Sequence, residues 1–424
     1  MYFLQCIDYL FNTKLHGSDL VKAVQNAHVF CVSISCGLGL VYYALYSFDM
    51  IPYLVKLIVV QLSLDFFLTD KPDILFHHII TLSMSYFFLS QFPVYYEIIQ
   101  LPYAVIISTE ISSFFLILNQ YFKGKSIWAS INNACFLLFF FYTRIYLYLK
   151  YVVFNHEYMS LISETVSVQN TMWHSSIVFS FLFINMHWSG IIIKTIYKKL
   201  RPPSLSYCLN EFLLQYTYFL SPVISFLTYG FNSNPIFLLD ILGQCVLSVN
   251  SCLYHRAVYK KLKLRPQDKV NVLDDDIRNA YIADIFSIQV RVFLVTLVNL
   301  SQLEYGMVYG GIVASFQLFF GYNFYDYIRD MKAKQRTIVY NEDKVMIDYL
   351  LFLPIASVIC IGIFHNNDRD ATNHVILSSF LLYNCIVIKP FYELNHFFLH
   401  LCLLYQSYAI SAINVSVLYK INSE

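Results

Sequence analysis

Charged side chains are scarce in this sequence: only 13% of its 424 residues are Asp, Glu, Lys or Arg, whereas 58% are hydrophobic. Such a chain has too little polar surface for a large soluble domain, and water is not its main solvent. The charges that do occur nearly cancel, and the formal net charge of +1 gives no sign of a nucleic-acid partner or of an acidic one. These shortages predict an integral membrane protein.

Several familiar motifs are missing as well. The ten cysteines contain no Cys-x-x-Cys pair and lie almost entirely in apolar blocks, which indicates buried thiols rather than a disulfide or zinc framework. The sequence has no phosphate loop, dinucleotide fingerprint or nucleophile elbow. It also has no internal repeat, so nothing in it indicates a duplicated transporter unit.

What the sequence has instead is a series of apolar blocks of about twenty residues, the length of a helix that crosses a hydrocarbon core of about 30 Å. Residues 134–142 and 358–364 are apolar at every position, which favours helices over the alternating strands of a β-barrel. We therefore predict an all-α, polytopic transmembrane bundle with about thirteen spans. The predicted spans are 21–47, 51–68, 74–90, 94–119, 127–152, 174–196, 211–230, 235–254, 278–299, 303–322, 345–364, 372–388 and 391–418.

A basic, proline-containing segment at 198–203 separates the first six spans from the last seven. We predict two domains, at 20–200 and 205–418, in a protein of the endoplasmic reticulum or another endomembrane. Lys and Arg collect in cytoplasmic loops, and their alternation here predicts a cytoplasmic N-terminus and a lumenal or extracellular C-terminus. The basic residues on the predicted cytoplasmic side are Lys22, Lys71, Lys123, Lys125, 194–201, 256–269, 329–336 and Lys389, against Lys150, Arg369 and Lys420 on the other side.

Ionisable residues inside a membrane are costly unless they are paired or functional, so they mark candidate sites. Asp65 closes the second predicted span, His77 and His78 open the third, and Glu110 and Arg144 lie in the fourth and fifth. Adjacent histidines point about 100° apart on a helix, so one can face a cavity while the other reaches a second helix. Alternatively, the two histidines could have no function and only extend toward the membrane–water interface. Their combination with Asp65, Glu110 and Arg144 indicates a catalytic site instead.

The first half resembles the TLC-domain family, which includes ceramide synthases and several regulators of membrane lipids. In those synthases paired histidines are implicated in transferring an acyl group from acyl-CoA to a sphingoid amine, so the resemblance implies that role for His77 and His78. The synthases follow this pair with two acidic residues in the next helix, whereas this chain has Glu110 alone, which is closer to the non-synthase branches. Acyl transfer and lipid regulation both stay open. The resemblance covers roughly residues 20–200 and is carried by Asn26, His28, Asp65, His77, His78, 109–114, Leu118, Asn119, Arg144 and 185–188.

The second half carries a sharper chemical pattern. His396 and His400 are four residues apart and share one helix face, the arrangement in which two imidazoles bind one metal ion. His255, four residues after Ser251, is predicted to lie at the same depth. Three imidazoles leave the fourth coordination position of a zinc ion open for water. Zinc lowers the pKa of this bound water to about 7, so that hydroxide is available to attack a carbonyl.

Two further residues complete this predicted site. Asp284 is our candidate for holding the water or moving a proton, and Ser251 for donating a hydrogen bond to an oxyanion. Asp268 and Asp276 are alternatives to Asp284, which we prefer because it lies inside an apolar span. A His-x-x-x-His pair by itself occurs often by chance, and only its convergence with the other residues indicates a metal site.

The order Ser-x-x-x-His, Asp, His-x-x-x-His across seven spans resembles the CREST superfamily, which includes alkaline ceramidases and the progestin and adiponectin receptor family. The resemblance covers about residues 205–418 and lies in these five polar positions. It implies zinc bound by His255, His396 and His400, and hydrolysis of lipid amides.

From both halves we expect a bifunctional enzyme of membrane lipids, with ceramide or a related sphingolipid as the shared substrate. A lipid-sensing receptor without turnover is one alternative. A transporter is the other, although candidate residues near a single membrane face favour chemistry over a conduction path.

Overall fold

A computed structural model describes residues 18–46, 50–66, 72–122, 127–165, 168–200, 207–230, 235–264, 275–300, 322, 369–391 and 394–421. Every regular element in these ranges is a helix, which confirms the prediction of an all-α chain. Within the same ranges, seven helices are long and apolar enough to cross a membrane, as expected for an integral membrane protein. They contain the segments Asn26–Leu45, Glu97–Asn119, Ile127–Val153, Asn170–Lys199, Phe237–Lys261, Arg369–Ile388 and Asn395–Ile413.

Other predicted spans are shorter or differently placed in the structure. The predicted spans 303–322 and 345–364 lie, apart from Tyr322, outside the described residues. The predicted span 211–230 is divided into two short helices by a turn at residues 218 and 219. Ile51–Ser63 is apolar but short, so the number of spans stays a prediction.

The chain divides into two compact units, residues 1–189 and 190–424. The division falls inside helix α7 (Val168–Leu200), ahead of the predicted linker at 198–203. Within the second unit, the Lys194 ammonium donates a hydrogen bond of 2.7 Å to the backbone carbonyl of Ile388. This contact helps explain why the end of α7 belongs to the second unit.

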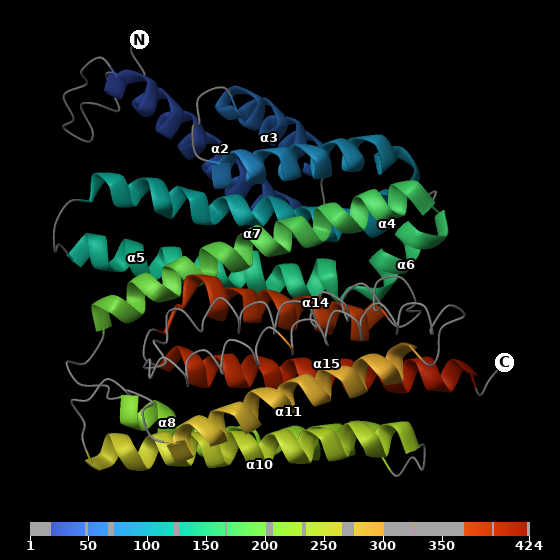
Figure 1. Cartoon of the computed structure of the whole chain (residues 1–424). Coiled ribbons are helices and arrows are strands. Elements are labelled where there is room, and N and C mark those ends of the chain that lie inside the picture. The colour runs from blue at the N-terminus through green and yellow to red at the C-terminus, as the bar shows by residue number, and fades with distance from the viewer. Residues whose placement is uncertain are drawn as a thin grey trace. The chain divides into compact units, whose positions relative to one another are not determined.

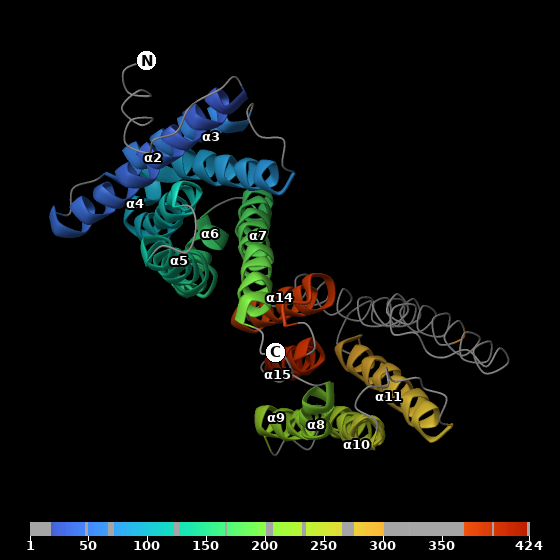
Figure 2. The same ribbon diagram turned by 90° about the vertical axis from the view of Figure 1, so that its left-hand side faces the viewer.

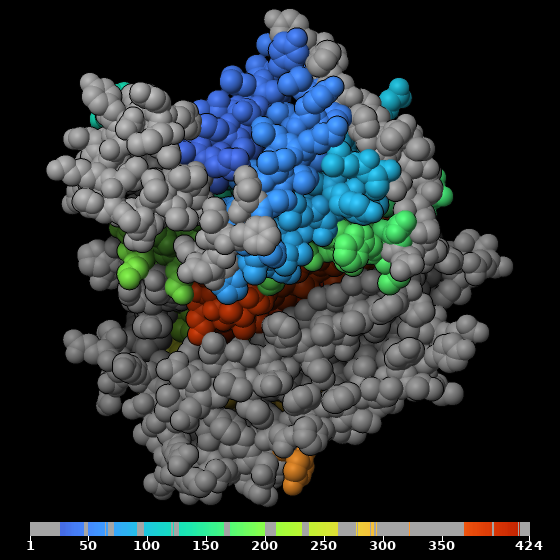
Figure 3. All heavy atoms as spheres, turned by 90° about the horizontal axis from the view of Figure 1, so that it is seen from above, coloured from blue at the N-terminus to red at the C-terminus, as the bar shows by residue number. Residues whose placement is uncertain are grey.

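The first unit is built from α2 (Ser18–Tyr46), α3 (Ile51–Phe66), α4 (Pro72–Tyr121), α5 (Ile127–Phe139), the π-helices η1 (Phe140–Leu147) and η2 (Leu149–Val153), α6 (His156–Thr165) and most of α7 (Figure 1). Helices α2, α3 and α4 pack together (Figure 2), and their side chains form one blue surface in Figure 3. Gly39 permits the close approach of α2 and α3, because a Cβ atom there would lie 2.8 Å from the Leu54 methyl groups.

Helix α4 spans fifty residues without interruption, although we predicted two spans with a break at 91–93. The Tyr103 hydroxyl nevertheless donates a hydrogen bond of 2.9 Å to the carbonyl of Met84. In a straight helix these residues would lie about 28 Å apart along the axis. The helix must therefore turn back between them, and its two arms pack side by side, with Phe88 and Tyr103 in ring contact. Pro93 lies between these arms, where a proline favours a bend.

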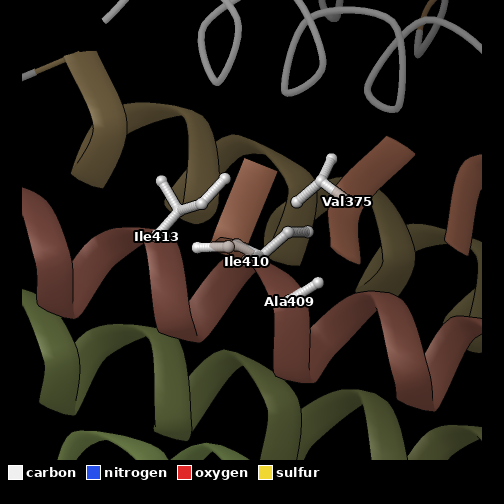
Figure 4. Close-up of a cluster of buried hydrophobic side chains, with 5 residues drawn as sticks. Val375, Ala409, Ile410 and Ile413 are labelled. Atoms are coloured by element: carbon white, nitrogen blue, oxygen red, sulfur yellow. The ribbon is translucent and has the colours of Figure 1, made fainter. Parts of the chain in front are cut away.

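The second unit contains α8 (Tyr207–Thr217), α9 (Leu220–Tyr229), α10 (Pro235–Leu264), α11 (Asp275–Leu300), α14 (Arg369–Tyr383), the π-helix η3 (Asn384–Ile388) and α15 (Asn395–Ile421). Helix α10 packs against α8, α9 and α11, and α15 packs against α8, α9 and α14. Figure 4 shows the small apolar cluster formed by α14 and α15, with Val375, Ala409, Ile410 and Ile413.

Both units differ from a water-soluble protein in the apolar side chains that they expose and in the polar groups that they bury within an apolar core. Large apolar side chains face outward, as Leu45 (70% exposed) and Leu227 (73% exposed) illustrate. Charged and polar groups such as Arg144, Asp240 and His255 are buried instead. Lipid is a suitable solvent for such a surface, while the buried polar groups hold the helices together through hydrogen bonds.

Candidate functional sites

The two adjacent histidines of α4 are both buried and face different neighbours. His78 Nε2 lies 3.3 Å from Asp65 Oδ2, at the end of α3. The His77 ring lies instead 5.1 Å from the Trp188 ring and 5.6 Å from the Phe181 ring, both on α7. The angular offset of neighbouring residues on a helix thus places one imidazole beside a carboxylate and the other against an aromatic wall.

Arg144 is the centre of a hydrogen-bond network between α4, η1 and α7. Its Nε donates to Ser112 Oγ (2.8 Å), its Nη2 to Ser113 Oγ (3.2 Å) and its Nη1 to Asn185 Oδ1 (3.3 Å). Ser113 in turn donates to Glu110 Oε2 (3.2 Å). The buried guanidinium therefore has several acceptors and, through one serine, a carboxylate of opposite charge. It lies within a π-helix, a geometry often found at functional positions.

Trp188 connects this network with the histidine pair. The Arg144 guanidinium lies 5.6 Å from the centre of the Trp188 ring, and His77 contacts that ring as well. The indole N–H donates a hydrogen bond of 3.1 Å to Asp73 Oδ2, which fixes the orientation of the ring. Our sequence reasoning gave Asn185 and Trp188 no role of their own, although both belong to the segment that carries the family resemblance.

In the second unit, three histidines from two helices meet. His255 lies on α10, and His396 and His400 lie on the first two turns of α15. One ring nitrogen of each can be chosen so that all three lie within 4.8 Å of one another. The ring centroids are 4.8 to 5.2 Å apart. This is a candidate metal centre of the kind expected from the histidine spacing.

Glu211 on α8 orients one of these histidines, and our sequence reasoning missed it. His255 Nδ1–H donates a hydrogen bond of 2.6 Å to Glu211 Oε2, and Asn210 Nδ2 donates to the other carboxylate oxygen (3.2 Å). Asn210 also accepts a hydrogen bond from the backbone N–H of Phe397 (3.1 Å), beside His396. A carboxylate bound to one imidazole nitrogen leaves the other nitrogen available as a metal ligand.

Three buried polar atoms at this site have no hydrogen-bond partner among the described residues: His255 Nε2, His400 Nδ1 and Asp284 Oδ1. Such atoms are costly in an apolar interior unless something binds them. Two nitrogens and a carboxylate oxygen are suitable donors for zinc and for water beside it. The residues present therefore fit a zinc ion.

Asp284 on α11 is hydrogen-bonded to Ser251 and interacts electrostatically with His255. The Ser251 hydroxyl lies on the same buried face of α10, one turn before His255. The structure thus brings together all five residues that the sequence singled out in this half. Of the alternatives to Asp284, Asp268 lies outside the described residues, and the side chain of Asp276 is also outside them.

No family model, curated protein or solved structure matches this chain, so its resemblance to the two families rests on the residues of these two sites.

Proposed function

We propose that the second half is a zinc-dependent hydrolase of lipid amides. The observation that carries this proposal is the cluster of His255, His396 and His400, whose ligand atoms lie within 4.8 Å of one another. Three imidazoles with an open fourth position are typical of hydrolytic zinc, whereas structural zinc sites are closed by a fourth protein ligand. The bound metal supplies a Lewis acid that activates water toward an amide carbonyl.

The neighbouring side chains would perform the remaining steps. Asp284 has a buried carboxylate oxygen without a partner in the described part of the chain, which is free to accept a proton from water and to pass it to the leaving amine. Ser251 has a single hydroxyl proton, which would turn from Asp284 to the oxygen of the carbonyl under attack when substrate binds. Glu211 would hold His255 in the tautomer whose Nε2 carries no proton and is available as a ligand.

The substrate class follows from the surroundings of the cluster. The helices around it expose apolar side chains, among them Leu253 on α10 and Leu209 on α8, so a substrate arrives from lipid rather than from water. Together with the resemblance to alkaline ceramidases, this favours ceramide or a related sphingolipid. We place the protein in the endoplasmic reticulum or another endomembrane, with its N-terminus in the cytoplasm.

For the first half we propose acyl transfer from acyl-CoA, or regulation of lipids without turnover. The pairing of His78 with Asp65 favours catalysis, because a carboxylate can orient an imidazole and stabilise its protonated form. With ceramide as the shared lipid, the first half would form the amide bond that the second half hydrolyses. A lipid-sensing receptor, which binds zinc without turnover, is the second candidate function for the chain.

We expect the purified chain to release fatty acid from fluorescent ceramide, and two variants to reduce the rate while they retain the metal. Ser251→Ala removes a donor to the developing oxyanion, which costs about 10²- to 10³-fold in kcat. Asp284→Asn removes proton transfer, which costs about 10²- to 10⁴-fold. Product would be measured by chromatography and zinc by mass spectrometry. A zinc-loaded wild-type chain without turnover on ceramides, sphingoid amides or other lipid amides would favour the receptor instead.

For the first half we expect His77→Ala and His78→Ala each to abolish acyl transfer from radiolabelled acyl-CoA to a sphingoid base. His78→Ala separates the imidazole from Asp65, and His77→Ala removes the ring packed against Trp188. Neither variant changes the histidine cluster of the second unit, so hydrolysis of ceramide should persist in both. His156→Ala, a change at an exposed histidine of α6, is the matched control. Acyl-transfer rates equal to wild type in both variants would remove the pair from the catalytic residues.

A further inference from the structure

A second buried polar cluster lies in the second unit, far from the histidines. Asp240 Oδ2 accepts hydrogen bonds from the Tyr229 hydroxyl (2.6 Å) and from Gln244 Nε2 (3.0 Å). The same Gln244 nitrogen donates to Ser225 Oγ (2.6 Å), which lies 2.9 Å from Ser411 Oγ. Asp240 lies fifteen residues before His255 on α10, a separation of about 22 Å along a helix.

The carboxylate of Asp240 is incompletely compensated. Its side chain is 1% exposed, and its Oδ1 has no hydrogen-bond partner within the described part of the chain. A buried carboxylate with a bare oxygen is costly unless a cation or a proton accompanies it. Neutral groups such as Ser225 and Gln244 suffice for hydrogen bonds that hold helices together, so such bonds alone do not explain the presence of a carboxylate.

Arg291 is a candidate for a protein counter-charge. Its Nη2 donates a hydrogen bond to Ser407 Oγ (2.6 Å). Ser407 Oγ also accepts a long hydrogen bond from the Ser221 hydroxyl (3.4 Å). Ser221 donates in addition to Gln244 Oε1 (2.7 Å). The guanidinium thus connects to the opposite end of the Gln244 amide, with two serines between. This connection leaves Oδ1 of Asp240 without a partner among the residues that the structure describes.

We propose that Asp240, Gln244, Ser225 and Ser411 bind a monovalent cation of the size of sodium. A carboxylate, hydroxyls and an amide carbonyl are the oxygen donors that hard cations prefer. One carboxylate favours a single positive charge, since divalent sites in proteins use more. In the structure Gln244 Nε2 faces Asp240 and Ser225, and Oε1 accepts from Ser221. When the cation binds, a half-turn of the amide would exchange these two atoms. Nε2 would then donate to Ser221, and Oε1 would join Asp240, Ser225 and Ser411 as an oxygen ligand from α9, α10 or α15.

The test uses the full-length chain in detergent and does not depend on zinc or on turnover. Replacing choline chloride by sodium chloride at constant ionic strength should raise the midpoint of thermal unfolding by about 2 to 6 °C, because the ligand binds the folded state. Asp240→Asn should abolish this shift. Dialysis with radioactive sodium should give saturable binding of about one ion per chain in the wild type.

Ser411→Ala provides a milder variant in case the Asp240→Asn chain fails to fold. Its matched control is Ser378→Ala, since Ser378 is equally buried in the same unit but donates to the backbone carbonyl of Val375. Sodium should bind more weakly to Ser411→Ala and normally to Ser378→Ala. Equal stabilisation by sodium and choline, or a sodium shift that persists in Asp240→Asn, would overturn the proposal. Stability that follows pH but ignores sodium would overturn it in favour of a proton.

Discussion

A chain with both His396 and His400 changed to alanine is expected to purify without zinc, whereas the natural chain should hold about one zinc ion. The double variant leaves a single imidazole, His255, in the cluster, and one imidazole does not retain zinc through purification. Hydrolysis of ceramide should be lost with the metal. Metal content would be measured by mass spectrometry after dialysis against a weak chelator.

Glu211→Gln is a milder substitution that tests the same metal site. The amide keeps the shape of the carboxylate but weakens its hold on His255 Nδ1–H, and such changes typically reduce metal affinity by about 10- to 100-fold. His374→Ala is the control, because His374 contacts Tyr405 on α15 but does not belong to the cluster. Full zinc content in the double variant would show that the ligand assignment is wrong, and a helical lipid-binding module would then describe this half better.

Arg144→Leu should lower the free energy of unfolding of the first unit by about 3 to 5 kcal/mol. The variant leaves the Glu110 carboxylate buried without the positive charge of Arg144. It also removes the N–H groups that donate hydrogen bonds to Ser112, Ser113 and Asn185. Denaturant titration in mixed micelles would measure the loss. Lys150→Ala in η2 is the control, because a substitution at this exposed position should leave the unfolding midpoint close to that of the wild type.

A second substitution tests whether charge is the cause. Combining Arg144→Leu with Glu110→Gln neutralises both partners and should recover part of the lost stability, because the uncompensated carboxylate is gone. If Arg144→Leu alone were as stable as Lys150→Ala, the network would not hold these helices together. If the double variant recovered nothing, packing of the arginine against Phe140 and Trp188 would outweigh its charge.

Helical structure was predictable from the sequence, whereas the lateral neighbours of each helix were not. The four-residue spacing of His396 and His400 places them on one helix face, and the structure has both on α15. Glu211 lies on a different helix, and only the packing of α8 against α10 reveals that it contacts His255. No periodicity in a single sequence specifies which helices pack together.

The buried network at Asp240 illustrates the same limit. Its members are spread over residues 221–411, and single serines in apolar helices are too common to attract notice in a sequence. The bend of α4 differs in this respect, since the break predicted at 91–93 lies close to it. There the end of one predicted span at residue 90 and the start of the next at residue 94 already implied a change of direction.

Helices α10 and α15 each carry part of the histidine cluster near one end and part of the Asp240 network eleven to fifteen residues away. A helix is stiff along its axis, so a piston-like shift or tilt imposed at one end is transmitted over about 16 to 22 Å to the other. Occupancy of one cluster is therefore expected to change the geometry, and with it the affinity, of the other. By thermodynamic linkage, binding at either cluster then changes the affinity of the other by the same factor. Helices α10 and α15 would carry this coupling.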